Sequence, residues 1–222
     1  MPPSFVIAIF AVFAVLALVS IVYSIIAEKK RKVAIESFAQ ELGLQYFADL
    51  PENDAYDFYQ FNISRKGRGQ STRNAIIADS GALRMVIFDF QFTTGSGKNK
   101  NTHRQTIMMA TSSESLQLPQ FTISPEGFMH RLGDFFGFKD IDFDDDKEFS
   151  DAFLLKGENE EAIRAYFDPL RRKKFMDYRD VTIEARGDTF IFYRPKVRVK
   201  TEEIRTLMER AFAIYTLLSV SE

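Results

Sequence analysis

Asp89, His103 and Arg104 are the residues of this sequence whose types suit acid–base chemistry. Asp89 interrupts an alternating aromatic stretch at 83–93, and His103 and Arg104 follow after a short polar loop. A carboxylate, an imidazole and a guanidinium in one place can move protons to and from a substrate. The pattern allows a hydrolase-like enzyme that uses Asp89 and His103, provided that both side chains converge in one pocket. The alternative is that Asp89 is a strand residue satisfied by hydrogen bonds.

A run of acids suggests a metal site. Asp140, Asp142 and Asp144 fit the first, third and fifth positions of a calcium-binding loop. However, Asp145 replaces the glycine at the sixth position, and Asp151 replaces the glutamate at the twelfth. These three aspartates are therefore weak candidate ligands, an acidic solvated turn is the alternative, and we expect no cofactor.

The loop at 95–101 contains glycines and lysines but does not bind nucleotides as a P-loop. An aromatic residue occupies the position of the first P-loop glycine, and Asn99 stands where Ser or Thr is required. The loop instead predicts the basic tip of a β-hairpin. Lys98 and Lys100 are candidate contacts for lipid headgroups or an acidic partner, and a solvated turn is the alternative.

Charge is segregated in the second half of the chain. Residues 134–161 contain eleven acids and three bases, whereas residues 164–200 contain eleven bases and five acids. The two regions either neutralise each other in the fold or leave a basic face for an anionic membrane surface. The core of the basic region is the run Arg171, Arg172, Lys173 and Lys174.

Composition limits the chemistry further. The 222 residues are 45% apolar and 27% charged, which is typical of a folded protein. The absence of cysteine excludes disulfides, thiolate metal sites and cysteine nucleophiles, and the chain has only 2 histidines. A net charge of −2 and the lack of a recognisable binding motif argue against nucleic acid as a partner.

Residues 5–27 form an uncharged apolar stretch that predicts a transmembrane helix. A signal peptide is the alternative, but it needs a basic start, a shorter apolar run and a small-residue cleavage site. The stretch is followed directly by Lys29, Lys30, Arg31 and Lys32. This membrane-flanking run is either a stop-transfer signal or an anionic-lipid site. By the positive-inside rule it predicts an outside N-terminus and a cytoplasmic C-terminal part.

The remaining pattern predicts one α+β domain. We divide the chain into a transmembrane anchor (1–27), a juxtamembrane helix (28–44) and a cytoplasmic domain (45–222). Alternation predicts strands at 56–63, 73–79, 83–93 and 102–111, and a later hairpin at 181–194. Capping residues predict helices that begin at Ser124, Asn159 and Thr201. This order favours an antiparallel sheet packed against amphipathic helices.

Short motifs along the domain resemble an uncharacterised bacterial family of small single-pass membrane proteins. The motifs are 88–92 (Phe-Asp-Phe-Gln-Phe), 95–98 (Gly-Ser-Gly-Lys), 118–121 (Leu-Pro-Gln-Phe) and 140–143 (Asp-Ile-Asp-Phe). The resemblance implies a bacterial inner-membrane protein with one N-terminal helix and a cytoplasmic α+β domain. It implies no activity and assigns no catalytic residue.

Three functions remain as hypotheses. The first is a membrane-tethered cytoplasmic binding or scaffold module without catalysis, with the bilayer, anionic headgroups and a membrane or cytoplasmic protein as its partners. The second is the membrane-associated enzyme built on Asp89 and His103. The third is a sensor of calcium or anionic lipid.

Overall fold

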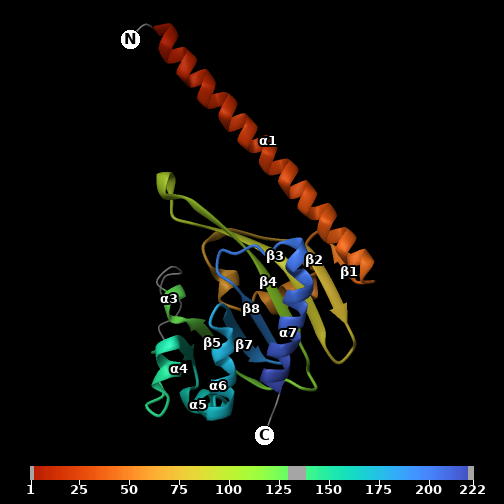
Figure 1. The fold of residues 1–222 in the computed structure, drawn as a ribbon, viewed down its shortest axis with the longest axis vertical. Coiled ribbons are helices and arrows are strands. Elements are labelled where there is room, and N and C mark those ends of the chain that lie inside the picture. Colours follow the sequence, from red (N-terminus) through yellow and green to blue (C-terminus); the bar gives the residue numbers. More distant parts are fainter. Residues whose placement is uncertain (1–2, 130–138, 220–222) are drawn as a thin grey trace.

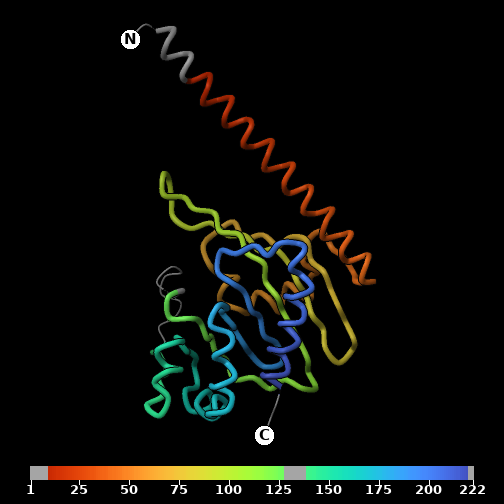
Figure 2. Tube along the Cα trace, viewed as in Figure 1, coloured from red at the N-terminus to blue at the C-terminus, as the bar shows by residue number. Residues whose placement is uncertain are grey.

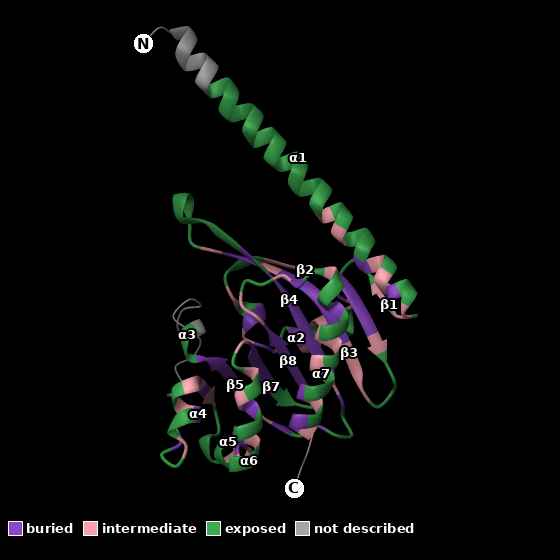
Figure 3. Cartoon of the chain, viewed as in Figure 1, coloured by how far each residue is buried: buried purple, intermediate pink, exposed green. Residues whose placement is uncertain are grey.

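One continuous helix, α1 (Pro3–Glu41), begins the chain and extends far beyond the folded domain (Figure 1). The computed structural model describes residues 3–129 and 139–219. The large apolar side chains of α1 from Phe10 to Ile26 are exposed (Figure 3), so this part is not a core helix of the domain. Within the described ranges, α1 is the one helix long and apolar enough to cross a membrane. It ends at Glu41, two residues before Gly43, whose φ of +66° is typical of a glycine that terminates a helix.

The domain is built on one antiparallel sheet, which confirms the α+β class. Its eight strands follow the order β1-β2-β3-β4-β8-β7-β5-β6. The strands are β1 (Gln45–Phe47), β2 (Arg68–Asp79), β3 (Arg84–Thr94), β4 (Asn101–Thr111), β5 (Leu118–Pro125), β6 (Phe153–Gly157), β7 (Thr182–Gly187) and β8 (Thr189–Tyr193). The expected hairpins at 83–111 and 181–194 are β3–β4 and β7–β8.

Side-chain alternation places two cores on the two faces of this sheet. On β3, Phe88, Phe90 and Phe92 point to one face, while Ile87 and Asp89 point to the other. The Phe88 face is covered by α2 (Glu52–Phe58) and the short helix η1 (Ile63–Arg65).

The opposite face is covered by helices from both ends of the chain. The last turns of α1 contribute Ile35 and Ala39 to this core. The other helices that pack there are α4 (Lys147–Ala152), α5 (Glu160–Tyr166), α6 (Pro169–Phe175) and α7 (Ile204–Ser219). Short turns complete the chain: η2 (Gly97–Asn99), α3 (Glu126–Met129), η3 (Met176–Tyr178) and η4 (Thr201–Glu203).

The expected strand at 56–63 is wrong. The segment forms the end of α2 and then η1, with acidic Glu52 and Asp54 in the first turn of α2. Tyr59 is exposed, whereas its neighbour Phe58 is fully buried and packs edge-on against Phe88. The apolar pattern of this short segment fits a helix or a strand, and the tertiary packing of Phe58 selects the helix.

Two of the three residues expected to cap helices do not cap them. Asn159 does cap α5 through its side chain. Thr201 lies inside η4, which Lys200 precedes as its cap residue. Ser124 lies within β5, which ends at Pro125, and it donates to Thr182 instead of capping a helix, so α3 begins at Glu126. The expected continuation of that helix through 130–138 lies outside the described residues.

Gly67 and Gly69 give a matched test of this packing. Both glycines have left-handed φ values, +64° and +61°, but a Cβ on Gly67 would lie 2.3 Å from the Thr93 carbonyl oxygen, whereas a Cβ on Gly69 meets nothing. We expect Gly69→Ala to cost about 1 kcal/mol of unfolding free energy. Gly67→Ala should cost about 1–3 kcal/mol more, because backbone atoms must move. Thermal unfolding of the full-length protein in detergent measures both, and equal losses would contradict the close approach.

Candidate functional site

Asp89 is the centre of an ion-pair network that joins α1 to the sheet. The Arg31 guanidinium, from α1, donates from Nε to Asp89 Oδ2 at 2.8 Å and from Nη2 to Oδ1 at 2.7 Å. Arg198 donates from Nη2 to Oδ2 at 2.9 Å. The Asp89 side chain is only 8% exposed. A carboxylate at this depth is stable only when cations and hydrogen bonds reach it.

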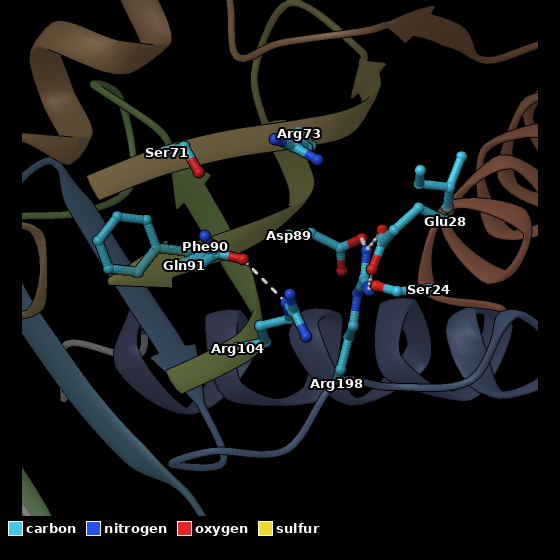
Figure 4. Close-up of a pocket in the computed structure, with 10 residues that line it drawn as sticks. Ser24, Glu28, Ser71, Arg73, Asp89, Phe90, Gln91, Arg104 and Arg198 are labelled. Carbon is cyan, nitrogen blue, oxygen red and sulfur yellow. Dashed lines mark hydrogen bonds and ion pairs between the residues drawn. The ribbon is translucent and has the colours of Figure 1, made fainter. Parts of the chain in front are cut away.

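Arg198 extends the network to a second acid on α1. Its Nη1 and Nη2 donate to the two carboxylate oxygens of Glu28 at 2.6 and 2.7 Å (Figure 4). Glu28 and Arg31 lie three residues apart on one side of α1, and Arg31 binds Asp89 on β3 while Glu28 binds Arg198 in the segment after β8. We call the four residues Glu28, Arg31, Asp89 and Arg198 the Asp89 clamp.

Local backbone structure places each member of the Asp89 clamp. Asn74 has a φ of +54° at an irregularity in β2, and its amide donates to Asp89 Oδ2 at 3.1 Å. Thr106, opposite Asp89 on β4, donates its hydroxyl to Oδ1 at 3.1 Å. The Thr106 hydroxyl also accepts from the Val199 amide at 3.0 Å, which fixes the segment that carries Arg198. Asp89 thus accepts five hydrogen bonds.

These contacts keep the Asp89 clamp charged. Burial alone would raise the pKa of Asp89, but the hydrogen bonds from Arg31 and Arg198 outweigh burial and lower the pKa below its ordinary value. The hydrogen bond from Arg198 likewise lowers the pKa of Glu28. Burial would lower the pKa of Arg198, but its bonds to Glu28 and Asp89 raise it instead. The network is therefore ionised at neutral pH.

A cavity of about 370 Å³ opens beside the Asp89 clamp, between α1 and the sheet. Ser24 and Ile25 of α1 form one wall. Figure 4 shows Arg73 and Arg104 on either side of the strand that carries Asp89. We call this cavity the arginine pocket, and its lining is Ser24, Ile25, Glu28, Ser71, Arg73, Asp89, Phe90, Gln91, Arg104 and Arg198.

His103 does not join Asp89. It pairs with Phe92 in the β3–β4 ladder, on the face opposite Asp89, and its ring lies 4.9 Å from the Phe92 ring. Its Nε2 is 2.7 Å from the Thr94 hydroxyl oxygen. Burial, with the charges of Lys196 and Lys66, lowers the pKa of His103 and favours a neutral ring. The geometry therefore does not form the proton-transfer pair on which the enzyme hypothesis depends.

Arg104 lies on the Asp89 face, and the basic loop lies at the same end of the sheet. Arg104 donates its Nε to Gln91 at 2.8 Å and lines the arginine pocket. Lys98 and Lys100 are exposed at the tip of the β3–β4 hairpin. Figure 2 shows this tip extending from the sheet on the side from which the apolar part of α1 leaves.

The run at 171–174 lies on α6, away from the apolar part of α1 (Figure 1). Arg172 is buried and pairs with Asp145 at 2.7 Å and Asp146 at 3.0 Å. Arg171 lies over the Tyr166 ring. These two arginines are occupied within the fold, which is the neutralising arrangement of the two charged regions, while Lys173 and Lys174 are exposed.

The calcium candidates do not assemble. Asp140 accepts hydrogen bonds from the amides of Leu155 and Ile141, both at 3.0 Å, and Asp142 and Asp144 are exposed. In the part of the chain that the structure describes, no group of three acidic or histidine side chains is placed to hold a metal ion. Of the membrane-flanking run, Arg31 is bound in the Asp89 clamp, while Lys29, Lys30 and Lys32 are exposed.

No sequence motif marks Glu28, Arg73 or Arg198 as a site residue. Arg198 lies between Val197 and Val199, and a charge between two apolar residues in an extended segment is a usable sign of a buried ion pair. Arg73 carries no comparable signal, because exposed arginines are common in strands.

Comparisons of this chain with protein-family models, curated proteins and solved structures gave no match. The resemblance to a bacterial membrane family therefore stays a prediction.

Asp89→Asn should uncouple α1 from the sheet. The substitution leaves two partly buried guanidinium groups without their shared carboxylate, which we expect to cost about 3–5 kcal/mol. Glu148→Gln is the matched control, because it breaks the exposed pair with Arg179 and should cost no more than about 1 kcal/mol. Chemical unfolding of the full-length protein in detergent measures both losses.

The stability difference between wild type and Asp89→Asn should depend on pH. The folded pKa of Asp89 lies below that of the unfolded chain, about 3.9. Its contribution is therefore complete at neutral pH and is lost as the pH falls below about 4 through the folded pKa. The stability difference between wild type and Asp89→Asn should be constant above about pH 5 and shrink below about pH 4. A difference that grows on acidification would contradict an ionised clamp.

Proposed function

We propose that the chain is a single-pass bacterial inner-membrane protein whose cytoplasmic domain is a binding or scaffold module without catalysis. In this arrangement residues 5–27 cross the bilayer, the N-terminus lies outside, and residues 45–222 lie in the cytoplasm. The basic residues Lys29, Lys30 and Lys32 after the apolar stretch support this orientation.

One observation carries the proposal. The bare apolar part of α1 continues without a break into turns that the Asp89 clamp and the buried Ile35 and Ala39 fix to the sheet. A domain joined in this way is held at a set height and orientation at the end of the apolar helix. Such a mount suits a module that presents one surface close to a membrane.

The enzyme hypothesis has less support, because Asp89 is already paired with Arg31 and Arg198 and His103 faces the other core. A calcium sensor also lacks an assembled ligand set among residues 139–219, which include all three aspartates. The anionic-lipid hypothesis keeps two basic features, namely the exposed hairpin tip and the arginine pocket, which α1 lines.

Orientation can be tested with single cysteines, because the natural chain has none. Ser113→Cys places an exposed thiol in the loop after β4. We expect a membrane-impermeant maleimide to label it only after the cells are lysed. Ser4→Cys, which precedes the apolar stretch, is the counterpart and should be labelled in spheroplasts. Labelling of Ser113→Cys in intact spheroplasts would reverse the proposed topology.

The binding function can be tested by in-cell crosslinking of the tagged full-length protein, followed by membrane extraction and mass spectrometry. We expect a partner that is recovered only when the domain is present, so residues 1–44 alone are the control. Lys98→Ala/Lys100→Ala should reduce recovery if the hairpin tip contacts that partner. Lys173→Ala/Lys174→Ala removes the same charge far from α1 and should not. Identical recoveries from the full chain and from residues 1–44 would count against a binding module.

A further inference from the structure

We propose that the arginine pocket binds a phosphate group, and that the group belongs to the headgroup of an anionic phospholipid. This inference deepens the proposed membrane function and rests on it for the source of the phosphate. Its chemistry, a phosphate held by arginines, follows from the pocket alone.

Arg73 and Arg104 supply uncompensated positive charge. Arg73 is the cross-strand partner of Asp89, yet its side chain makes no ion pair or hydrogen bond among residues 3–129 and 139–219. The reason is that the two oxygens of Asp89 already accept five hydrogen bonds. Arg104 bonds only to the neutral Gln91 through Nε, which leaves its terminal nitrogens open.

The charge balance of the site matches a phosphate. Three guanidinium groups line the pocket against two carboxylates, which leaves a surplus of one positive charge, the charge that the phosphodiester of an anionic phospholipid neutralises. The contributing residues are Arg73, Arg104 and Arg198 against Glu28 and Asp89. Arginine binds phosphate oxygens in pairs through its planar fork of N–H groups.

Arg198 contributes charge to the site but no open donor. Its Nε is buried, so a ligand in the pocket does not reach it, and both terminal nitrogens are already paired with Glu28 and Asp89. Arg73 and Arg104 therefore supply the donors for a phosphate. Arg198 lines the pocket, together with the hydroxyl-bearing Ser24 and Ser71. An acceptor-rich ligand suits this lining.

The wall on α1 identifies the lipid as the source. Ser24 and Ile25 belong to the last turn of the apolar stretch, immediately before the first charged residue, Glu28. In the proposed membrane arrangement this is the depth of the headgroups. The volume of about 370 Å³ is at the small end for ligand pockets and fits a headgroup without its acyl chains.

The test uses the full-length protein in nanodiscs and variants Arg73→Gln/Arg104→Gln. The matched control is Lys173→Gln/Arg186→Gln, which removes the same charge from exposed positions on α6 and β7. Native mass spectrometry counts phosphatidylglycerol retained by each protein from phosphatidylcholine discs doped with that lipid. We expect the wild type and the control to retain one phosphatidylglycerol, and the Arg73/Arg104 variant to bind it at least about tenfold more weakly.

A second arm separates the two sources of phosphate. Glycerol 3-phosphate is titrated calorimetrically into wild type in pure phosphatidylcholine discs. No heat with it, together with arginine-dependent phosphatidylglycerol retention, supports the lipid headgroup. Arginine-dependent heat without phosphatidylglycerol retention overturns the lipid source in favour of a soluble phosphate.

Equal retention by wild type and the Arg73/Arg104 variant overturns the site. Because Arg73 and Arg104 are exposed and without acidic partners, the variant should unfold at the wild-type temperature, so lost binding cannot be ascribed to lost fold. The cysteine-labelling result is independent of these measurements. Equal lipid retention with the expected cysteine labelling would overturn the pocket alone, whereas reversed labelling would overturn the proposed membrane topology.

Discussion

A carboxylate buried in a sheet destabilises the fold unless cations pair with it, and Asp89 is such a carboxylate. The cations come from places far apart in the sequence, because Arg31 is 58 residues before Asp89 and Arg198 is 109 residues after it. Satisfying one side chain therefore brings together the start of the domain, the middle of the sheet and the segment before α7. The path of the chain at this end of the sheet follows from that requirement.

The sequence predicted what depends on local pattern. The alternation of Phe88, Phe90 and Phe92 gave the β3–β4 hairpin and its two faces, and Asn159 marked the start of α5. It also drew attention to Asp89 as a charge in an aromatic strand. It failed at β5 and β6, because β5 has a proline near each end and β6 is a short edge strand.

The partners of Asp89 were beyond prediction for a physical reason. Arg31 sits in a basic run after an apolar stretch, where stop-transfer signals have the same composition, so its buried role has no local signature. The register of β3 against β4 also decides that Asp89 and His103 face apart. A hairpin predicted with a loop of uncertain length does not fix that register, since a shift of one residue exchanges the faces.

The unbroken course of α1 has a mechanical consequence. Each residue of an α-helix turns the chain by about 100°, so the helical phase between Ser24 and Arg31 sets which side of the apolar segment lies towards the domain. With no hinge in that interval and the Asp89 clamp at its end, torque on one part is delivered to the other. Rotation of the apolar segment about its axis would therefore rotate the whole sheet with it as one rigid body.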